Sequence, residues 1–581
     1  MAKGYRPVDR DQVFLFAPDM REWLPEDHPV WLVIRAVEEH LDTSAFHAGR
    51  RTGGAGAAGY DPDMLVTVLV WAYAHKVTSS REIERLCGTD VAFRVICAGN
   101  QPDHVTFARF RGAFPDAAGE FFAQVLVLCA RLGMGKLGTV ALDGMKIAGN
   151  ASKAANRTEE SLARLAAETV AAHAAADAAE DELFGEGRRG DEVPEEAWRP
   201  RSRDSRIAAA LASLRADREA AAAAEEARAQ AYRERRAAGE RAGCSPASAA
   251  VELAQENLAR VRAARAAELA ELQERYAAGQ PRRGRPAGVD DHCRVRQAKA
   301  RVEAAKARAA QADRKAAGRE ANRKGPGPVR NTTDPDSRLM PVRGGGFLQG
   351  YNTQNMTSED GLIIATELTD DQTDFAWFEP MTRKAAQAAA LIEEHRPASP
   401  DPGHQPASPD SSAPDSSAPD DGAPDSSGPD DGGTDSSGTD DGGAGGGIGL
   451  VLADAGYCSE DNLTSPGPDR LIATGKGRDL EKAARAPGSD SPGRGGPATQ
   501  AMRERLKTPD GIAAYRQRGH IAETPHGHIK HNMRFRQLTM RGKPKAAAEW
   551  TFTCGISNLF RAITTGHLTT TALDRLTTPP A

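Results

Sequence analysis

One segment in the second half of the chain limits what the rest can fold into, because it cannot form a packed interior. Residues 397–446 consist largely of Asp, Pro, Gly and Ser, and they include no aromatic and no branched apolar side chain. Such a composition cannot bury enough apolar surface to offset the entropy lost on ordering, so we predict a disordered linker. Apolar patterns resume on both sides, which indicates that the linker interrupts a domain and that its ends lie close together. Closing a long loop costs little more free energy than closing a short one.

The negative charge of the chain is concentrated in the same segment. Residues 401–441 hold eleven Asp and no Lys or Arg, and subtracting them from the formal net charge of −6 leaves +5 for the remainder. A mildly basic body is compatible with a polyanionic partner. The seven cysteines are dispersed and include no C-x-x-C pair, which indicates reduced thiols and neither a disulfide framework nor a zinc finger. Because we find no secretory signal and no apolar stretch long enough to span a membrane, we expect a cytoplasmic protein without a membrane partner.

Residues 1–135 are predicted to form a helical N-terminal domain. Two apolar segments at helical spacing are followed by three short helical units separated by Gly and Pro, and the last unit carries Arg109 and Arg111. Short helices that end in an Arg-bearing one are compatible with a DNA-binding helix-turn-helix, and equally with a small bundle whose arginines are solvated. Arg109 and Arg111 lie about 200° apart around a helix, so they cannot both face one groove of DNA.

Residues 158–330 have a different character. This part is rich in Ala, Arg and Glu and poor in bulky apolar residues, so it favours long helices. We predict a helical arm or hairpin with a narrow apolar seam, inserted after the first strand of an α/β domain. The last helix of the arm, 295–317, is basic, and it is either a solvated helix surface or a contact with DNA.

Apolar strand-like segments flank the arm and the linker, and they indicate one α/β domain assembled from residues 136–157, 331–396 and 447–570. Asp143 lies inside the first of these strands, and Asp454 directly follows a later one. A lone Asp after a strand is most often a cap or turn residue, because its side chain accepts backbone N–H groups. Because two acids lie in comparable places, a cap or turn role alone explains them less well.

A third acid, Glu523, is predicted to lie near the start of a basic C-terminal helix. Three carboxylates on separate elements can converge on divalent metal ions, which prefer oxygen ligands. Two Mg²⁺ ions about 3.5–4 Å apart can activate a water and stabilise the leaving oxygen of a phosphodiester. Spacing alone is a weak argument for such a site, since the chain holds 81 acidic residues.

Several blocks of the sequence resemble DDE transposases of bacterial insertion sequences, in the branch that has a Tyr-Arg-Glu-Lys signature near the C-terminus. The resemblance spans the chain outside the Asp-rich linker. In chain order the resembling blocks include YDPDMLVTVLVWAYAHK, VALDGMKIAGNASKAANRT, EDELFGEGRRGDEVPEE, LADAGYCSEDN and YRQRGHIAETPHGHIKHNMRFRQLTMRG. The resemblance implies an α/β RNase H-like catalytic domain with a helical N-terminal domain and a long helical insertion.

The resemblance also implies a catalytic triad and its metal ions. Asp143, Asp454 and Glu523 match the three acids that would bind Mg²⁺ or Mn²⁺, as two ions. In one departure from the usual signature, four residues separate Arg518 from Glu523 where relatives have three. This different spacing weakens the assignment of a role to Arg518 more than the assignment of Glu523.

Further residues are expected to contact DNA. They are Tyr515, Arg518 and Lys530 of the signature, and Arg109 and Arg111 of the N-terminal domain 1–135. The resemblance implies that this domain binds the transposon ends. Lys530 lies two helical turns after Glu523, so it can share the same face and grip a phosphate. His526 stands where relatives usually carry an aromatic residue, and we interpret it, with His528 and His531, as solvated or phosphate-facing.

As the resemblance implies, the protein is expected to be a DNA transposase. It would bind double-stranded DNA at terminal inverted repeats, cut it there and join the freed ends to target DNA. It would act as a homodimer and be associated with the nucleoid when bound. Two alternatives stay open: an RNase H-fold nuclease that cuts without joining, and an inactive, domesticated relative that only binds DNA.

Overall fold

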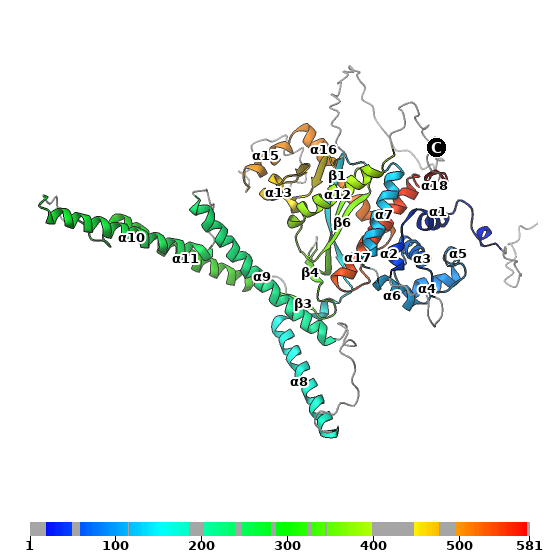
Figure 1. Cartoon of the computed structure of the whole chain (residues 1–581), viewed down its shortest axis with the longest axis horizontal. Helices are drawn as coiled ribbons and strands as arrows, with labels where there is room; N and C mark the ends of the chain where they lie inside the picture. Colours follow the sequence, from blue (N-terminus) through cyan, green and yellow to red (C-terminus); the bar gives the residue numbers. More distant parts are fainter. Residues whose placement is uncertain are drawn as a thin grey trace, which may run out of the picture. The chain divides into compact units, whose positions relative to one another are not determined.

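The computed structural model describes residues 19–48, 59–113, 115–184, 203–238, 247–280, 286–321, 328–342, 345–397, 447–475 and 495–577. Residues 398–446 of the predicted linker lie outside these ranges. The chain forms two compact units, shown in Figure 1. The first unit consists of Met1–Gly149 and Tyr351–Ala581, and the second unit of Asn150–Gly350.

The first unit is built on a mixed β-sheet. Its strands are β1 (Thr139–Ala148), β5 (Phe347–Ser358), β6 (Ile363–Thr369), β7 (Leu450–Ala453) and β8 (Asp469–Ile472). Strands β1, β7 and β8 run parallel in that order, with Leu142 opposite Ala453. β5 lies on the other side of β1 and pairs antiparallel with β6. β7 is apolar throughout because a parallel strand inside a sheet is covered on both faces.

Successive residues of the strands face two separate hydrophobic cores. Val140 and Leu142 belong to the larger core, whereas Ala141 belongs to a smaller one together with Ile521 and Ala522 of the C-terminal part. The helices that contribute are α7 (Ala117–Arg131), α12 (Phe378–His395) and α17 (Lys543–Thr564) for the larger core, and α15 (Pro497–Arg505) and α16 (Pro509–Gly527) for the smaller. Since side chains alternate along a strand, Asp143 shares the face of Ala141 and points toward α16.

The N-terminal helices share the larger core with the sheet. They are α1 (Pro29–Arg35), α2 (Ser44–His47), α3 (Pro62–Ala74), α4 (Ser80–Thr89), α5 (Val91–Ile96) and α6 (His104–Ala113). α3 is largely buried and contacts α17, and the rings of Phe121 in α7 and Phe552 in α17 lie 4.6 Å apart between centroids. The N-terminal helices therefore pack as part of the first unit, and the separate domain 1–135 stays a functional prediction.

The three short helices predicted before α7 are present as α4, α5 and α6. Asp103 caps α6 by accepting a hydrogen bond from the Thr106 N–H at 2.6 Å, whereas Ser79 at the start of α4 makes no side-chain cap. Among the described helices, none is by itself long and apolar enough to cross a membrane. The bent pair of α6 and α7 passes that test jointly, by length and composition alone.

The second unit contains the predicted long helices. These are α8 (Glu159–Phe184), α9 (Arg203–Ala237), α10 (Ala247–Ala277) and α11 (Cys293–Ala321), shown in cyan to green in Figure 1. They are bracketed by a two-stranded antiparallel sheet of β2 (Asn156–Thr158) and β3 (Val329–Asn331), and β4 (Arg338–Pro341) pairs with the first residues of β5. α8 and α9 enclose a small core around Leu162 and Ile207, and α10 packs along α11.

The C-terminal helix differs from its prediction. α16 begins at Pro509, where the Thr508 hydroxyl accepts a hydrogen bond from the Gly511 N–H at 3.0 Å and caps the helix. Glu523 consequently lies near the end of α16, and the expectation that it lies near a helix start was wrong. After Gly527 the chain continues as a π-helical turn, η7 (His528–Asn532), so Lys530 is not on the same regular helix as Glu523.

Candidate active site

Two acids meet where β7 ends beside β1. The pairing of the two strands runs up to Leu142 and Ala453, and the next residue on each strand is Asp143 and Asp454. The carboxyl ends of neighbouring parallel strands are the usual place for a ligand site in an α/β sheet. The structure therefore brings together two of the three acids that the sequence singled out.

Asp143 is held by two residues of α16. Its Oδ1 lies 3.7 Å from Arg518 Nη1, and its Oδ2 lies 3.6 Å from His526 Nδ1. Burial by itself would raise the pKa of Asp143, but His526 and Arg518 hold that pKa below its ordinary value. The Asp143 carboxylate is consequently ionised at neutral pH.

Asp454 is both a helix cap and a site residue. Its Oδ1 accepts a hydrogen bond from the Gly456 N–H at 2.8 Å and so caps the short helix η6 (Ala455–Tyr457). Burial raises the pKa of Asp454; the Gly456 N–H and Arg518 oppose the rise, while the charges of Asp143 and Asp374 add to it. The cap explanation is correct for one oxygen, and the raised pKa is due first to burial and then to the two neighbouring acids.

Asp374 is an acid of this site that the sequence reasoning missed. It precedes the short helix η5 (Phe375–Trp377), and its Oδ1 accepts hydrogen bonds from Asn352 Nδ2 at 2.6 Å and Gln354 Nε2 at 2.8 Å. A Cβ placed on Gly456 would lie 2.9 Å from Asp454 Oδ1 and 3.3 Å from Asp374 Oδ2. The two oxygens are thus within about 6 Å of each other, the sum of those distances.

Glycines and buried amides of the neighbouring strands allow this approach. A Cβ on Gly144 would lie 2.7 Å from Asp374 Oδ1 and 2.9 Å from Gln354 Nε2, so a side chain there would displace the acid. Gln354 is fully buried, and its Oε1 accepts a hydrogen bond from the Tyr457 hydroxyl. No sequence pattern indicated Asp374, because its position depends on hydrogen-bond partners in β5 and not on its neighbours in the chain.

The basic residues of the signature surround Asp143 and Asp454. The Tyr515 hydroxyl donates to the Ala453 carbonyl at 3.2 Å, which ties α16 to the end of β7. The Arg518 guanidinium lies 5.9 Å from the Tyr515 ring centroid, and its buried Nη1 has no hydrogen-bond partner in the part of the chain that is described. Burial lowers the pKa of Lys530, while attraction to Asp143 opposes that change.

Glu523 stands apart from the two aspartates. Its side chain is exposed, and within the described ranges no hydrogen bond or ion pair joins it to Asp143 or Asp454. Glu523 precedes His526 by three residues, so the two are neighbours on the surface of α16. The described contacts therefore do not bring the third predicted acid together with the two aspartates, and its role as a metal ligand stays a prediction.

His526 does not have the exposed position that the sequence suggested. Its side chain is buried, Asn355 Nδ2 lies 3.1 Å from its Nε2, and its Nδ1 faces Asp143. The interpretation of His526 as solvated was wrong, because it lies on the α16 face that covers the sheet. His531 is exposed, and burial and the charge of Arg561 lower the pKa of the half-buried His528.

The two arginines of α6 have different environments. Arg109 is exposed, whereas Arg111 Nη1 donates to the Tyr73 hydroxyl and the Thr78 carbonyl, both at 2.9 Å. The Tyr73 hydroxyl in turn donates to Glu549 Oε1 at 2.8 Å. The Arg111 guanidinium is therefore hydrogen-bonded inside the protein, which disagrees with the prediction that it contacts DNA. Only Arg109 is kept as a candidate DNA contact.

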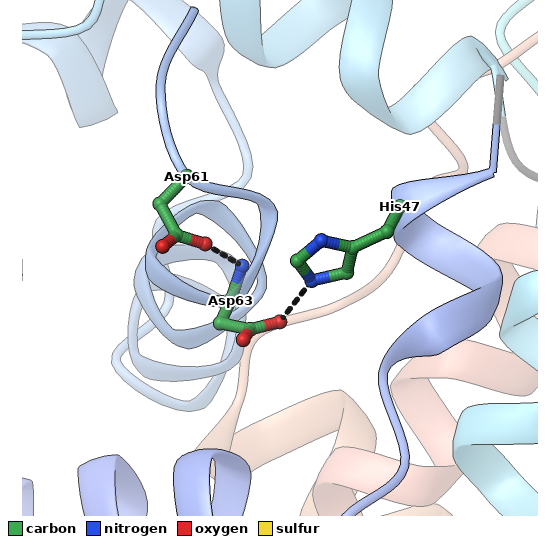
Figure 2. A group of neighbouring side chains, drawn as sticks. All are labelled: His47, Asp61 and Asp63. Atoms are coloured by element: carbon green, nitrogen blue, oxygen red, sulfur yellow. Dashed lines mark hydrogen bonds and ion pairs between the residues drawn. The ribbon is translucent and has the colours of Figure 1, made fainter. Parts of the chain in front are cut away.

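A further acidic group lies among the N-terminal helices (Figure 2). Ligand atoms of His47, Asp61 and Asp63 lie within 4.8 Å of one another, as expected for a metal-binding group. Asp61 Oδ1 accepts a hydrogen bond from the Asp63 N–H at 2.9 Å, however, and His47 Nε2 lies 2.8 Å from Asp63 Oδ1. Capping of α3 and pairing with His47 explain these side chains, so we assign no metal to them.

Asp143 and Asp454 are suited to hold a divalent cation. Both present carboxylate oxygens, the ligand type that Mg²⁺ prefers, and Asp374 lies close to Asp454. Burial contributes most to the raised pKa of Asp454, and the charges of Asp143 and Asp374 add to it. A bound cation would offset the repulsion among these acids.

Two segments of the chain match models of known protein families. Residues 18–113 match the family described as Transposase domain (DUF772), and residues 496–563 match the family described as Transposase DDE domain. Both matches are to transposase domains. Together they support a DDE transposase family, and the second one implies an RNase H-like fold. No curated protein and no solved structure matches the chain.

The matched segments include most of the residues discussed above. The first contains Arg109, and the second contains α15, α16 and most of α17, with Glu523 and the basic residues of the signature. A DDE transposase domain supports an enzyme that acts on DNA, and such domains generally use divalent metal ions.

Proposed function

We propose that the protein is a DNA transposase that binds terminal inverted repeats and catalyses metal-dependent DNA cleavage and strand transfer. The observation that carries this proposal is the meeting of Asp143 and Asp454 at the ends of two neighbouring parallel strands. The match of residues 496–563 to a DDE domain adds the helix that covers these acids. The mixed sheet, interrupted after β1 by a helical unit, supports an RNase H-like catalytic domain with a helical insertion.

In this proposal Asp143 and Asp454 hold Mg²⁺ or Mn²⁺, and Glu523 is the candidate third ligand. Two such ions would activate a water and stabilise the leaving oxygen of the phosphodiester. His526 and Arg518 orient the Asp143 carboxylate, and the Gly456 N–H fixes one oxygen of Asp454. These contacts keep the two acids in place before DNA arrives, so little reorganisation is needed on binding.

DNA would be held by cations around the acids. Arg518 and Lys530 lie near Asp143 and are suited to bind phosphate oxygens, Arg518 with its planar fork. Tyr515 is assigned to positioning α16, because its hydroxyl already donates to the Ala453 carbonyl. Arg109 would contact the terminal repeats from the N-terminal helices, and a homodimer would bring two ends together.

The proposal is tested by neutralising each acid separately. Asp143→Asn and Asp454→Asn are expected to lower Mg²⁺- or Mn²⁺-dependent cleavage by more than about 100-fold, the upper range for residues that only support a ligand. Binding of the same duplex should persist. The substrate is a duplex that carries the inverted repeats flanking the coding sequence, and cleaved and joined products are separated on denaturing gels. Asp461→Asn, an exposed acid close to the site, is the matched control.

The outcomes separate the candidate functions. Cleavage of the ends without joined product would identify a nuclease, and binding without cleavage in either metal would identify an inactive relative. Wild-type cleavage by Asp143→Asn or Asp454→Asn would remove that residue from the site. Glu523→Gln decides whether the exposed acid is the third ligand, since unchanged cleavage would exclude it.

A further inference from the structure

The exposed surface of α11 carries cations at regular intervals. Arg294, Arg301, Arg308 and Lys315 follow one another every seven residues, and all four are exposed. Seven residues of an α-helix make almost two full turns, so consecutive side chains of this series differ by about 20° in direction and lie about 10 Å apart, which adds up to about 60° from Arg294 to Lys315. The sequence therefore builds a stripe of positive charge that winds slowly along one side of the helix.

The orientation of this stripe is fixed by a buried seam on α11, about a quarter of a turn around the helix from the cations. Val295, Ala298, Val302 and Ala305 are buried and form the seam against α10. Because they recur at three- and four-residue spacing, they define a single buried face. α11 cannot rotate about its axis without exposing this seam, so the cations stay on the outside.

Two neighbouring hollows lie along the stripe and share Arg308. One, of about 560 Å³, is lined by Arg236 of α9, Arg301 and Arg308, together with residues of α10. The other, of about 500 Å³, is lined by Arg308, Arg314 and Lys315 among others. Among the side chains that the structure describes, no acidic one lines either hollow. We call these five cations the basic face: Arg236, Arg301, Arg308, Arg314 and Lys315.

Several other charged residues of the arm are paired, in contrast to the basic face. Arg262 lies 2.7 Å from Asp290, Lys306 lies 2.9 Å from Glu303, and Arg275 lies 3.2 Å from Glu271. No ion pair with another described side chain is found for any residue of the basic face. Five like charges that have no acidic partner among the described side chains repel one another, and a polyanion relieves that repulsion.

We propose that the basic face of the helical arm binds the phosphate backbone of double-stranded DNA. From Arg294 to Lys315 the stripe spans about 30 Å, close to one turn of the double helix at about 34 Å. Arg forks suit phosphate oxygens, and α11 has no aromatic side chain on which unpaired bases could stack. The contact should therefore be independent of sequence. This inference rests on the proposed function, and it adds a DNA-binding surface on the second unit.

The test removes two cations from the basic face of the full-length chain. Arg301→Gln/Arg308→Gln is compared with Arg262→Gln/Arg275→Gln, which removes the same charge from paired arginines of the same arm. Binding of a random-sequence duplex is measured by fluorescence anisotropy across a salt series without divalent ions. The basic-face variant should bind about tenfold more weakly, and the slope of log affinity against log salt should become shallower by about 2. The control should keep the wild-type slope.

Two results would overturn the inference. One is an unchanged salt slope in the basic-face variant. The other is an equal loss of DNA affinity in the control variant, which would mean that the effect depends only on the net charge of the arm. Stronger competition by an acidic polypeptide than by the duplex would also overturn it, in favour of a protein partner. The proposed function fails separately, because it is judged by cleavage of the ends. If the wild-type protein cleaves the ends and the basic-face variant binds DNA as tightly as the wild type, only the inference about the arm is wrong. If the wild-type protein does not cleave the ends but the basic-face variant has a reduced salt slope, only the proposed transposase chemistry is wrong.

Discussion

At the scale of single residues, the site depends on groups that hold the acids as well as on the acids themselves. Asp143 is oriented by His526 and Arg518, and Asp454 by the Gly456 N–H. Asp374 is held on one oxygen by two buried amides of β5 and leaves the other facing the loop that carries Asp454. A third carboxylate in that position adds negative charge where a cation would bind.

Replacing Asp374 should therefore weaken metal binding. Asp374→Asn retains an oxygen that can accept from Asn352 and Gln354, so the loop should keep its place while one charge is lost. We expect the affinity for Mn²⁺ to fall by about 10- to 100-fold, as for residues that support or complete a metal site. Titration with Mn²⁺ followed by electron paramagnetic resonance measures this without any cleavage assay. Glu379→Gln, an exposed acid of the following helix, serves as the control, and an unchanged Mn²⁺ affinity would restrict Asp374 to packing.

At the scale of elements, α6 carries two arginines, Arg109 and Arg111, that have different roles. Arg111 turns inward to the Tyr73 hydroxyl, which also contacts the buried Glu549 in the second turn of α17. Glu549 additionally accepts from the Thr539 and Met540 N–H groups at 2.8 and 3.0 Å. The network joins α3, α6 and α17, so it supports the packing of the N-terminal helices rather than DNA recognition.

Arg111→Ala should accordingly destabilise the protein. Removing the guanidinium leaves a buried carboxylate without its nearby positive charge, and such losses cost about 3 kcal/mol. Urea unfolding followed by circular dichroism gives the free energy of unfolding. Arg109→Ala, from the exposed side of the same helix, should change stability by less than about 0.5 kcal/mol and lower affinity for the terminal repeats. Equal stability losses in the two variants would contradict this division.

At the scale of the whole molecule, segments from both ends of the chain build one core. α3 and α7 pack on α17, and Phe121 meets Phe552 across the contact between α7 and α17. The sheet between them comes from three separate stretches of the chain, with the helical arm between β1 and β5. An end-binding function of residues 1–135 would therefore be exerted from within the first unit.

A fragment of residues 1–135 should not fold by itself. Without α17 it would expose several large apolar side chains, each worth about 1.5–3 kcal/mol when buried. The loss of four such contacts removes about 6–12 kcal/mol, which is comparable with the total stability of an ordinary domain, about 5–15 kcal/mol. Differential scanning calorimetry should show no cooperative transition for the fragment and at least one for the full chain. A sharp transition in the fragment would show that the N-terminal helices form an independent domain.

The sequence by itself determined the elements whose pattern is local. The strand around Asp143, the strand ending at Asp454, the three short helices and the long helices of the arm follow from apolar spacing and composition within a few turns. The likeness of ordered blocks to transposases also came from sequence, and the two family matches support it. The junction of Asp143 and Asp454 was thus foreseeable.

Only the tertiary structure decided which polar side chains meet. Burial of His526 beside Asp143, the inward orientation of Arg111 and the approach of Asp374 to Asp454 each depend on elements far apart in the chain. The exposure of Glu523 was likewise decided by how α16 packs. Local periodicity gives the face of a helix or strand, but it does not specify which other element covers that face. Hydrogen bonding and desolvation act across those contacts, so the environment of each acid was set by packing that the sequence pattern does not encode.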